Sequence, residues 1–126
     1  MTIIFRSNAS STVGFGHLNR CRALAYALKL KGQNCIMIGP EKKYKNYTDE
    51  SIFKDWISVD HWNSTEQDSA MLIKIAKKNH QSFLILDDYR INEDYQLNLR
   101  NEGLKWLQFD HKENSRPIWA DIILNP

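Results

Sequence analysis

The chain has 126 residues, 42% of them hydrophobic and 25% charged, which is an ordinary composition for one globular domain. Its 17 basic and 15 acidic side chains leave a net charge of +2, so no electrostatic feature points to nucleic acid or an anionic membrane as a partner. No apolar run approaches the roughly 18 residues of a membrane-spanning helix, and the N-terminus lacks a signal-peptide pattern. Two cysteines are too few for a disulfide framework, so we expect a cytoplasmic protein.

Short apolar strands alternate with helical patterns along the chain. Thr2–Arg6 is a predicted strand, and Ser7–Gly16 is rich in Ser, Asn and Gly, as loops are. From His17 onward, apolar side chains recur every three or four residues, which predicts a helix that stops at Gly32. Cys35–Ile38 is the second predicted strand.

The second part of the chain continues the alternation. The polar stretch Lys42–Lys54 predicts a loop with one helical turn, and Ile57–Val59 a minor strand. The remaining expected elements are a helix at Thr65–Asn79, a buried strand at Phe83–Leu86, a helix from Asn92 to Gly103, and strands at Trp106–Phe109 and Ile122–Leu124. This order predicts an α/β fold, a doubly wound, mostly parallel Rossmann-like sheet, as a single domain of residues 1–126.

Ligands of such sheets bind outside the carboxyl ends of the strands, where the loop Ser7–His17 is expected to lie. Gly14 and Gly16 allow close approach of a ligand, and the following helix N-terminus is a natural seat for phosphate. The dinucleotide fingerprint GxGxxG fails, because Asn19 occupies the third glycine position and the loop before Gly14 is too long. We therefore expect no NAD or FAD.

His17 stands where the loop becomes the helix. A helix N-terminus disfavours imidazolium, which predicts a neutral ring able to accept a proton near neutral pH. Arg20, three residues further on, could meet an anionic substrate. On spacing alone, His17 could equally cap or pack against the turn, and Arg20 could be a solvated surface residue.

Asp87, Asp88 and Tyr89 follow the most apolar strand. Adjacent strand residues point to opposite faces, so at most one of the two acids can face a given site. Capping and loop hydrogen bonds are the alternative for at least one of them, and the Tyr89 hydroxyl could bind a sugar. Asp110 and His111 repeat the acid-at-strand-end pattern more weakly.

No metal site is expected. The histidines at 61, 80 and 111 show no HExxH or HxH spacing, and no CxxC pair exists. Cys21 and Cys35 are interpreted as small buried hydrophobic residues. There is also no GxSxG elbow and no Walker lysine.

Phe5–Ser11 (FRSNASS), followed by Val13–Arg20 (VGFGHLNR), resembles the N-terminal signature of the PseG-type UDP-sugar hydrolases of pseudaminic acid biosynthesis, relatives of the spore-coat polysaccharide protein SpsG. The resemblance continues through Leu84–Tyr89 and from Trp106 to the end of the chain. It is poor over Lys42–Asn79.

This resemblance implies the N-terminal, sugar-side domain of a two-domain GT-B fold. The implied reaction is hydrolysis of a UDP-linked diacetamido-trideoxy-hexose to free sugar and UDP, with inversion at the anomeric carbon and without a metal or other cofactor. His17 would be the general base and Tyr89 an active-site tyrosine. The residues expected on the substrate side of the cleft are Arg6, Asn8, Gly14, Gly16, Arg20 and Asp88.

Two positions depart from the family pattern: Asn8 stands where aspartate is usual, and His111 follows Asp110 where a second acid is common. The family's UDP-binding C-terminal domain has no counterpart in these 126 residues, so the expected partners are that domain and a UDP-sugar. The alternative, from another functional class, is a non-catalytic sugar-binding or interaction module.

Overall fold

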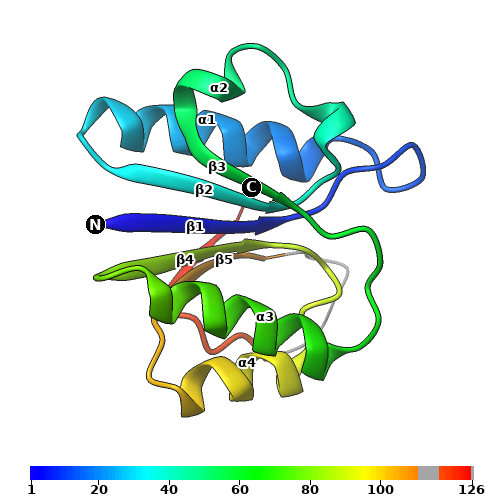
Figure 1. The fold of residues 1–126 in the computed structure, drawn as a ribbon. Helices are drawn as coiled ribbons and strands as arrows, with labels where there is room; N and C mark the ends of the chain where they lie inside the picture. Colours follow the sequence, from blue (N-terminus) through cyan, green and yellow to red (C-terminus); the bar gives the residue numbers. More distant parts are fainter. Residues whose placement is uncertain (111–116, 126) are drawn as a thin grey trace.

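The computed structural model describes residues 1–110 and 117–125, which form a six-stranded parallel sheet with helices on both faces (Figure 1). The strands are β1 (Thr2–Ser7), β2 (Asn34–Gly39), β3 (Phe53–Ser58), β4 (Ser82–Asp87), β5 (Trp106–Phe109) and β6 (Ile122–Leu124). The helices are α1 (Gly16–Leu30), α2 (Asp49–Ile52), α3 (Thr65–Lys78) and α4 (Glu93–Asn101), with a 3₁₀ turn at Lys42–Tyr44.

The strand order is β3-β2-β1-β4-β5-β6. The chain winds outward from β1 to β3, returns to the centre, and winds the other way from β4. Consequently α1 and α2 lie on one side of the sheet and α3 and α4 on the other (Figure 1). The predicted doubly wound α/β fold is confirmed, and its topological switch point lies between β1 and β4, where Ser7 pairs with Asp87.

Alternate residues of the central strands point to the two opposite faces of the sheet, where they form two hydrophobic clusters. Under α1 pack Ile3, Phe5 and Ile85, with Leu18, Cys21 and Ala25 of the helix. Under α3 and α4 pack Ile4, Leu84 and Leu86, with Leu72, Ala76 and Leu99. Each large side chain fully buried in this way stabilises the fold by about 1.5–3 kcal/mol. The same alternation sends Ser7 and Asp87 to the α1 side, and Arg6 and Asp88 to the α3 and α4 side.

Local signals fix several of the boundaries. The Asn92 side chain accepts a hydrogen bond from the Tyr95 backbone N–H at 2.9 Å, which confirms the predicted cap of α4. Ser64 caps α3 in the same way through Gln67, at 3.1 Å. Cys21 and Cys35 have no exposed surface, so their interpretation as buried hydrophobic residues is confirmed. No helix in the described ranges is both long and apolar enough to cross a membrane.

The region between β2 and α3 differs from the prediction. β3 begins at Phe53 and ends at Ser58, so the predicted strand Ile57–Val59 starts too late, and α2 precedes it directly. Phe53 and Trp56 are buried under α1, whereas Lys54 and Asp55 are exposed. Because β3 is an edge strand with a register shift against β2, its polar residues obscured the pattern.

Candidate active site at the switch point

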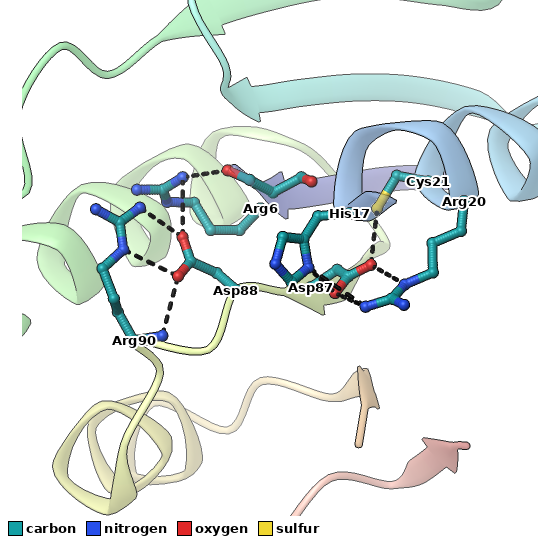
Figure 2. Close-up of polar contacts among 8 residues, drawn as sticks. Arg6, His17, Arg20, Cys21, Asp87, Asp88 and Arg90 are labelled. Atoms are coloured by element: carbon teal, nitrogen blue, oxygen red, sulfur yellow. Dashed lines mark hydrogen bonds and ion pairs between the residues drawn. The ribbon is translucent and has the colours of Figure 1, made fainter. Parts of the chain in front are cut away.

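The switch point brings His17 of helix α1 and Asp87 of strand β4 together (Figure 2). α1 begins at Gly16, so His17 lies in its first turn, and Asp87 is the last residue of β4. His17 Nδ1 lies 2.7 Å from Asp87 Oδ1. The Asp87 side chain has no exposed surface, and that of His17 is 13% exposed. The His17 ring is therefore partly accessible to solvent, whereas the carboxylate that it contacts is not.

Two groups approach His17 Nδ1: Asp87 Oδ1 at 2.7 Å and Arg20 Nη2 at 3.3 Å. An ionised carboxylate only accepts hydrogen bonds, so the shorter contact assigns the proton to Nδ1, which donates it to Asp87. Nε2 then holds the lone pair and is the nitrogen that can take up a proton. The His17–Asp87 pair thus has the arrangement of the histidine and the acid of a Ser-His-Asp triad, in which the acid orients the ring and stabilises its protonated form.

Arg20 binds the same carboxylate in a two-point contact. Its Nε donates to Asp87 Oδ2 at 2.6 Å and its Nη2 donates to Oδ1 at 2.7 Å. The hydrogen bond to Asp87 raises the pKa of Arg20, with partial burial opposing it. Cys21 Sγ lies 3.9 Å from Oδ2, and burial raises the pKa of this thiol, so it remains a donor. Contact of Arg20 with a substrate stays a prediction.

Asp88 points to the opposite face and takes no part in the pair with His17. Its Oδ1 accepts from the Arg90 backbone N–H and Nε at 3.0 and 2.9 Å, and its Oδ2 accepts from Arg90 Nη2 at 2.6 Å (Figure 2). Sequence reasoning selected Asp88 as a site residue and omitted Asp87. The signal that could have selected Asp87 is the alternation Phe83, Ile85, Asp87, but its use requires knowing that this set faces α1.

Arg6 is buried beneath the same strand ends, with 1% of its surface exposed. Its Nε and Nη2 donate to Asp68 of α3 at 3.0 and 2.8 Å, and Nη1 donates to the Ser7 carbonyl at 2.7 Å. Burial by itself would lower the pKa of Arg6, but the hydrogen bond and charge of Asp68, with the charge of Asp88, raise it. The Tyr95 hydroxyl donates to Asp68 Oδ2 at 2.5 Å. This network anchors β1 to α3 and α4.

A pocket of about 240 Å³ opens beside this network, between the loops that follow β1, β2, β3 and β4. Asn8, Arg6, Tyr89 and Arg90 are among its lining residues. Tyr89 is 43% exposed, and its ring centre lies 6.1 Å from that of His17. Tyr89 therefore links the pocket to the His17–Asp87 pair, and four predicted site residues (Arg6, Asn8, Tyr89 and His17) gather in one region.

The glycine loop lies between β1 and α1. Gly14 has φ +88°, a conformation that favours glycine, and its N–H donates to the Ser10 carbonyl at 2.8 Å. Gly16 is the first residue of α1. Gly14 and Gly16 therefore belong to the turn that connects β1 to the first turn of α1, where His17 lies. Their contact with a ligand stays a prediction.

Within residues 1–110 and 117–125, no cluster of three or more His, Cys, Asp or Glu side chains could hold a metal ion. Asp110 follows β5, where its backbone N–H donates to the Leu124 carbonyl at 2.7 Å. His111 lies outside the described residues.

The fold is shared with a transferase of known structure. A ugt transferase from Siraitia grosvenorii, solved in complex with UDP, matches with a TM-score of 0.59 and 15% identity, covering 86% of this chain and 27% of that one. The switch-point topology and this similarity together define a Rossmann-like domain of the type found in GT-B glycosyltransferases. At this level of identity, the match concerns the fold.

Sequence comparison gives a more specific similarity. The chain is 29% identical over 126 residues to the UDP-2,4-diacetamido-2,4,6-trideoxy-beta-L-altropyranose hydrolase of Campylobacter jejuni. It is 28% identical over 126 residues to an uncharacterized protein of Methanocaldococcus jannaschii. It spans 41% and 25% of the lengths of these relatives, and no protein-family model matches. The predicted resemblance to PseG-type hydrolases is thus confirmed over the whole chain.

Proposed function

We propose that this chain is the N-terminal, sugar-binding and base-carrying part of a hydrolase that cleaves a UDP-linked diacetamido-trideoxy-hexose to free sugar and UDP. The observation that carries the proposal is the His17–Asp87 pair, 2.7 Å apart at the switch point of the sheet. Similarity along the whole chain to a hydrolase named for such a substrate supports the choice of reaction.

His17 acts as the general base of this reaction. Its Nε2 takes a proton from a water molecule as the water oxygen forms a bond to the anomeric carbon. The bond from that carbon to the UDP oxygen breaks on the opposite side, so UDP leaves with the electron pair and the configuration inverts. Asp87 keeps Nδ1 protonated and offsets the positive charge on the ring. Such proton transfer contributes roughly 10²–10⁴-fold to the rate.

The other groups surround this centre. Tyr89 packs beside the base and binds the sugar, with Asn8, Arg6 and Asp88 along or beneath the pocket. Gly14, Gly16 and Arg20 lie toward the leaving diphosphate, near the positive end of the α1 dipole. The UDP moiety is bound chiefly by a C-terminal nucleotide-binding domain, in keeping with a chain that spans 41% of the hydrolase it resembles. The free sugar would serve pseudaminic (nonulosonic) acid or surface polysaccharide biosynthesis in a bacterial cytoplasm.

The test is release of UDP from the UDP-diacetamido-trideoxy-hexose by a polypeptide that joins this chain to a UDP-binding domain. His17→Ala should lower kcat by at least about 10²-fold, and NMR of the fresh product should show the inverted anomer. Unchanged turnover in His17→Ala would remove the histidine from the mechanism. If the sugar binds but no form releases UDP, the chain is instead a non-catalytic sugar-binding module.

A further inference from the structure

We infer that the pocket beside Tyr89 is a subsite for an acetamido group, and that Arg90 is its specificity-determining residue. This inference rests on the proposed function, because it names the part of the sugar that the same site distinguishes. It follows from how Arg90 is held and from the other side chains that line the pocket.

Arg90 is a fixed hydrogen-bond donor at the pocket wall. Its Nε and Nη2 are held by Asp88 at 2.9 and 2.6 Å, and its guanidinium carbon lies 4.4 Å from the ring centre of Trp62. The side chain is 28% exposed. Among the described residues, none accepts a hydrogen bond from Nη1, so this group can donate to a ligand without first leaving a partner. A planar fork that is already oriented loses little freedom on binding.

The other residues that line the pocket supply hydrogen-bond acceptors and apolar surface, in contrast to the donor Arg90. Glu41 and Asp60 also line the pocket, and their side chains carry carboxylates, which accept but do not donate hydrogen bonds. Ala9, Val13 and Val59 add apolar surface. An acetamido group carries one carbonyl acceptor, one N–H donor and one methyl group. It can therefore receive a hydrogen bond from Arg90, donate one to a carboxylate, and pack its methyl group against the apolar side chains.

The charges at the pocket disfavour an anionic occupant. Arg90 is neutralised by Asp88, and Arg6 is neutralised by Asp68 at 2.8 Å. Glu41 pairs at 3.1 Å with Lys43 in an exposed contact, which screens little, and Asp60 is exposed. A phosphate here would meet two carboxylates, so the diphosphate is directed away from the pocket and toward α1.

The size of the pocket agrees with a subsite. A volume of about 240 Å³ falls below the roughly 300–1,000 Å³ of sites that enclose a whole small ligand. It suits one part of a sugar nucleotide. Because Tyr89 contacts both the pocket and His17, a substituent bound here leaves the sugar ring within reach of the base.

Titration of the chain with N-acetylglucosamine and with glucose, followed by NMR, tests this inference. The two probes differ only in the acetamido group. N-acetylglucosamine should shift the Trp62 indole and Arg90 Nε–H resonances in a saturable manner, and glucose should not. Arg90→Lys keeps the charge beside Asp88 but loses the fork, and should weaken the apparent affinity about tenfold. Arg100→Lys is the matched control, because Arg100 lies 5.0 Å from the ring centre of another tryptophan, Trp106.

Equal shifts with both sugars, no shifts with either, or unchanged affinity in Arg90→Lys would each overturn the acetamido subsite. The outcome is separable from that of the proposed function, since free sugar binding needs neither UDP nor the base. Acetamido-dependent binding without UDP release from any form contradicts only the hydrolase. UDP release that is equally fast from a substrate without acetamido groups contradicts only the subsite.

Discussion

Arg20 and Arg22 lie two residues apart on α1, and each holds an aspartate whose side chain is wholly buried. Arg20 donates to Asp87 at 2.6 and 2.7 Å, and Arg22 donates to Asp49 at 3.0 and 2.7 Å. The two pairs share their chemistry and the full burial of the aspartate, although the Arg20 side chain is 30% exposed and that of Arg22 is 17% exposed. They differ in that Asp87 also accepts from His17, whereas Asp49 ties α1 to the segment around α2. The chain therefore contains a control for the function of Asp87.

If the proposed hydrolysis is carried out by the polypeptide joined to a UDP-binding domain, Asp87→Asn in that polypeptide should lower kcat for UDP release by about 10²–10⁴-fold, because a neutral amide no longer fixes the His17 tautomer or stabilises imidazolium. Asp49→Asn should destabilise the fold to a similar degree and leave kcat unchanged. Kinetics and urea unfolding of both variants separate the two effects. Parallel losses of kcat in both would show that Asp87 acts only through stability.

Gly39→Ala should destabilise the protein by about 2–5 kcal/mol, from backbone strain plus overpacking. Gly39 has φ +127°, and an added Cβ would lie 2.1 Å from the Ser7 carbonyl oxygen and 2.2 Å from Arg6 Nη1. Gly32→Ala is the control, since Gly32 has φ +85° but no neighbouring atom within 4 Å of an added Cβ. Gly32→Ala should lower the free energy of unfolding by about 1–2 kcal/mol, from backbone strain alone. Urea unfolding measures both, and equal losses would refute close packing at Gly39.

Much of the fold can be predicted from the sequence, because β1, β4 and the three longer helices have local periodicity that their burial matches. The Arg6–Asp68 and His17–Asp87 pairs could not be predicted, since 62 and 70 residues separate their members. Only the register that sets Ser7 beside Asp87 decides which acid faces α1. His17 could be selected from its place after a glycine loop, whereas Asp87 and Asp88 are equivalent until the strands pair.

Asp68→Asn should destabilise the fold by about 3–5 kcal/mol, because it removes the near counter-charge of the buried Arg6 guanidinium and leaves only Asp88, 3.9 Å from Arg6 Nη1 and already bound to Arg90. The Tyr95 hydroxyl would lose a charged acceptor at the same time. Glu66→Gln, an exposed change two residues earlier in α3, should lower the free energy of unfolding by less than about 1 kcal/mol. Denaturant midpoints of the two variants give the comparison, and a small loss in Asp68→Asn would contradict the anchoring role of the network.

Stability should fall as the pH rises above about 9. Burial raises the pKa of Cys35 from 9.0 to about 11, and burial likewise raises the pKa of Cys21 and of Tyr95. In alkali these groups lose protons in the unfolded chain before they do so in the folded one. Their contribution is therefore complete below pH 9 and declines above it, by up to about 1.4 kcal/mol per pH unit for each group.

Urea midpoints measured from pH 8 to pH 11 test this dependence. Tyr95→Phe removes one ionising group and should flatten the decline above pH 10, the ordinary value for tyrosine. The exposed Tyr47 provides the control as Tyr47→Phe, which should leave the slope unchanged. A stability that stays constant up to pH 11 would contradict the burial of the three groups.

The central pairing of β1 with β4 has a consequence for folding kinetics. β1 and β4 are far apart in the sequence, with Thr2 paired to Ser82, so contacts between sequence neighbours cannot bring them together. Their association therefore costs a large loop-closure entropy and should occur late in folding. β1, α1 and β2 are close in sequence and can associate earlier. During refolding, secondary structure should therefore recover before the tertiary packing around the switch point, and a chain arrested halfway would hold His17 without its acid.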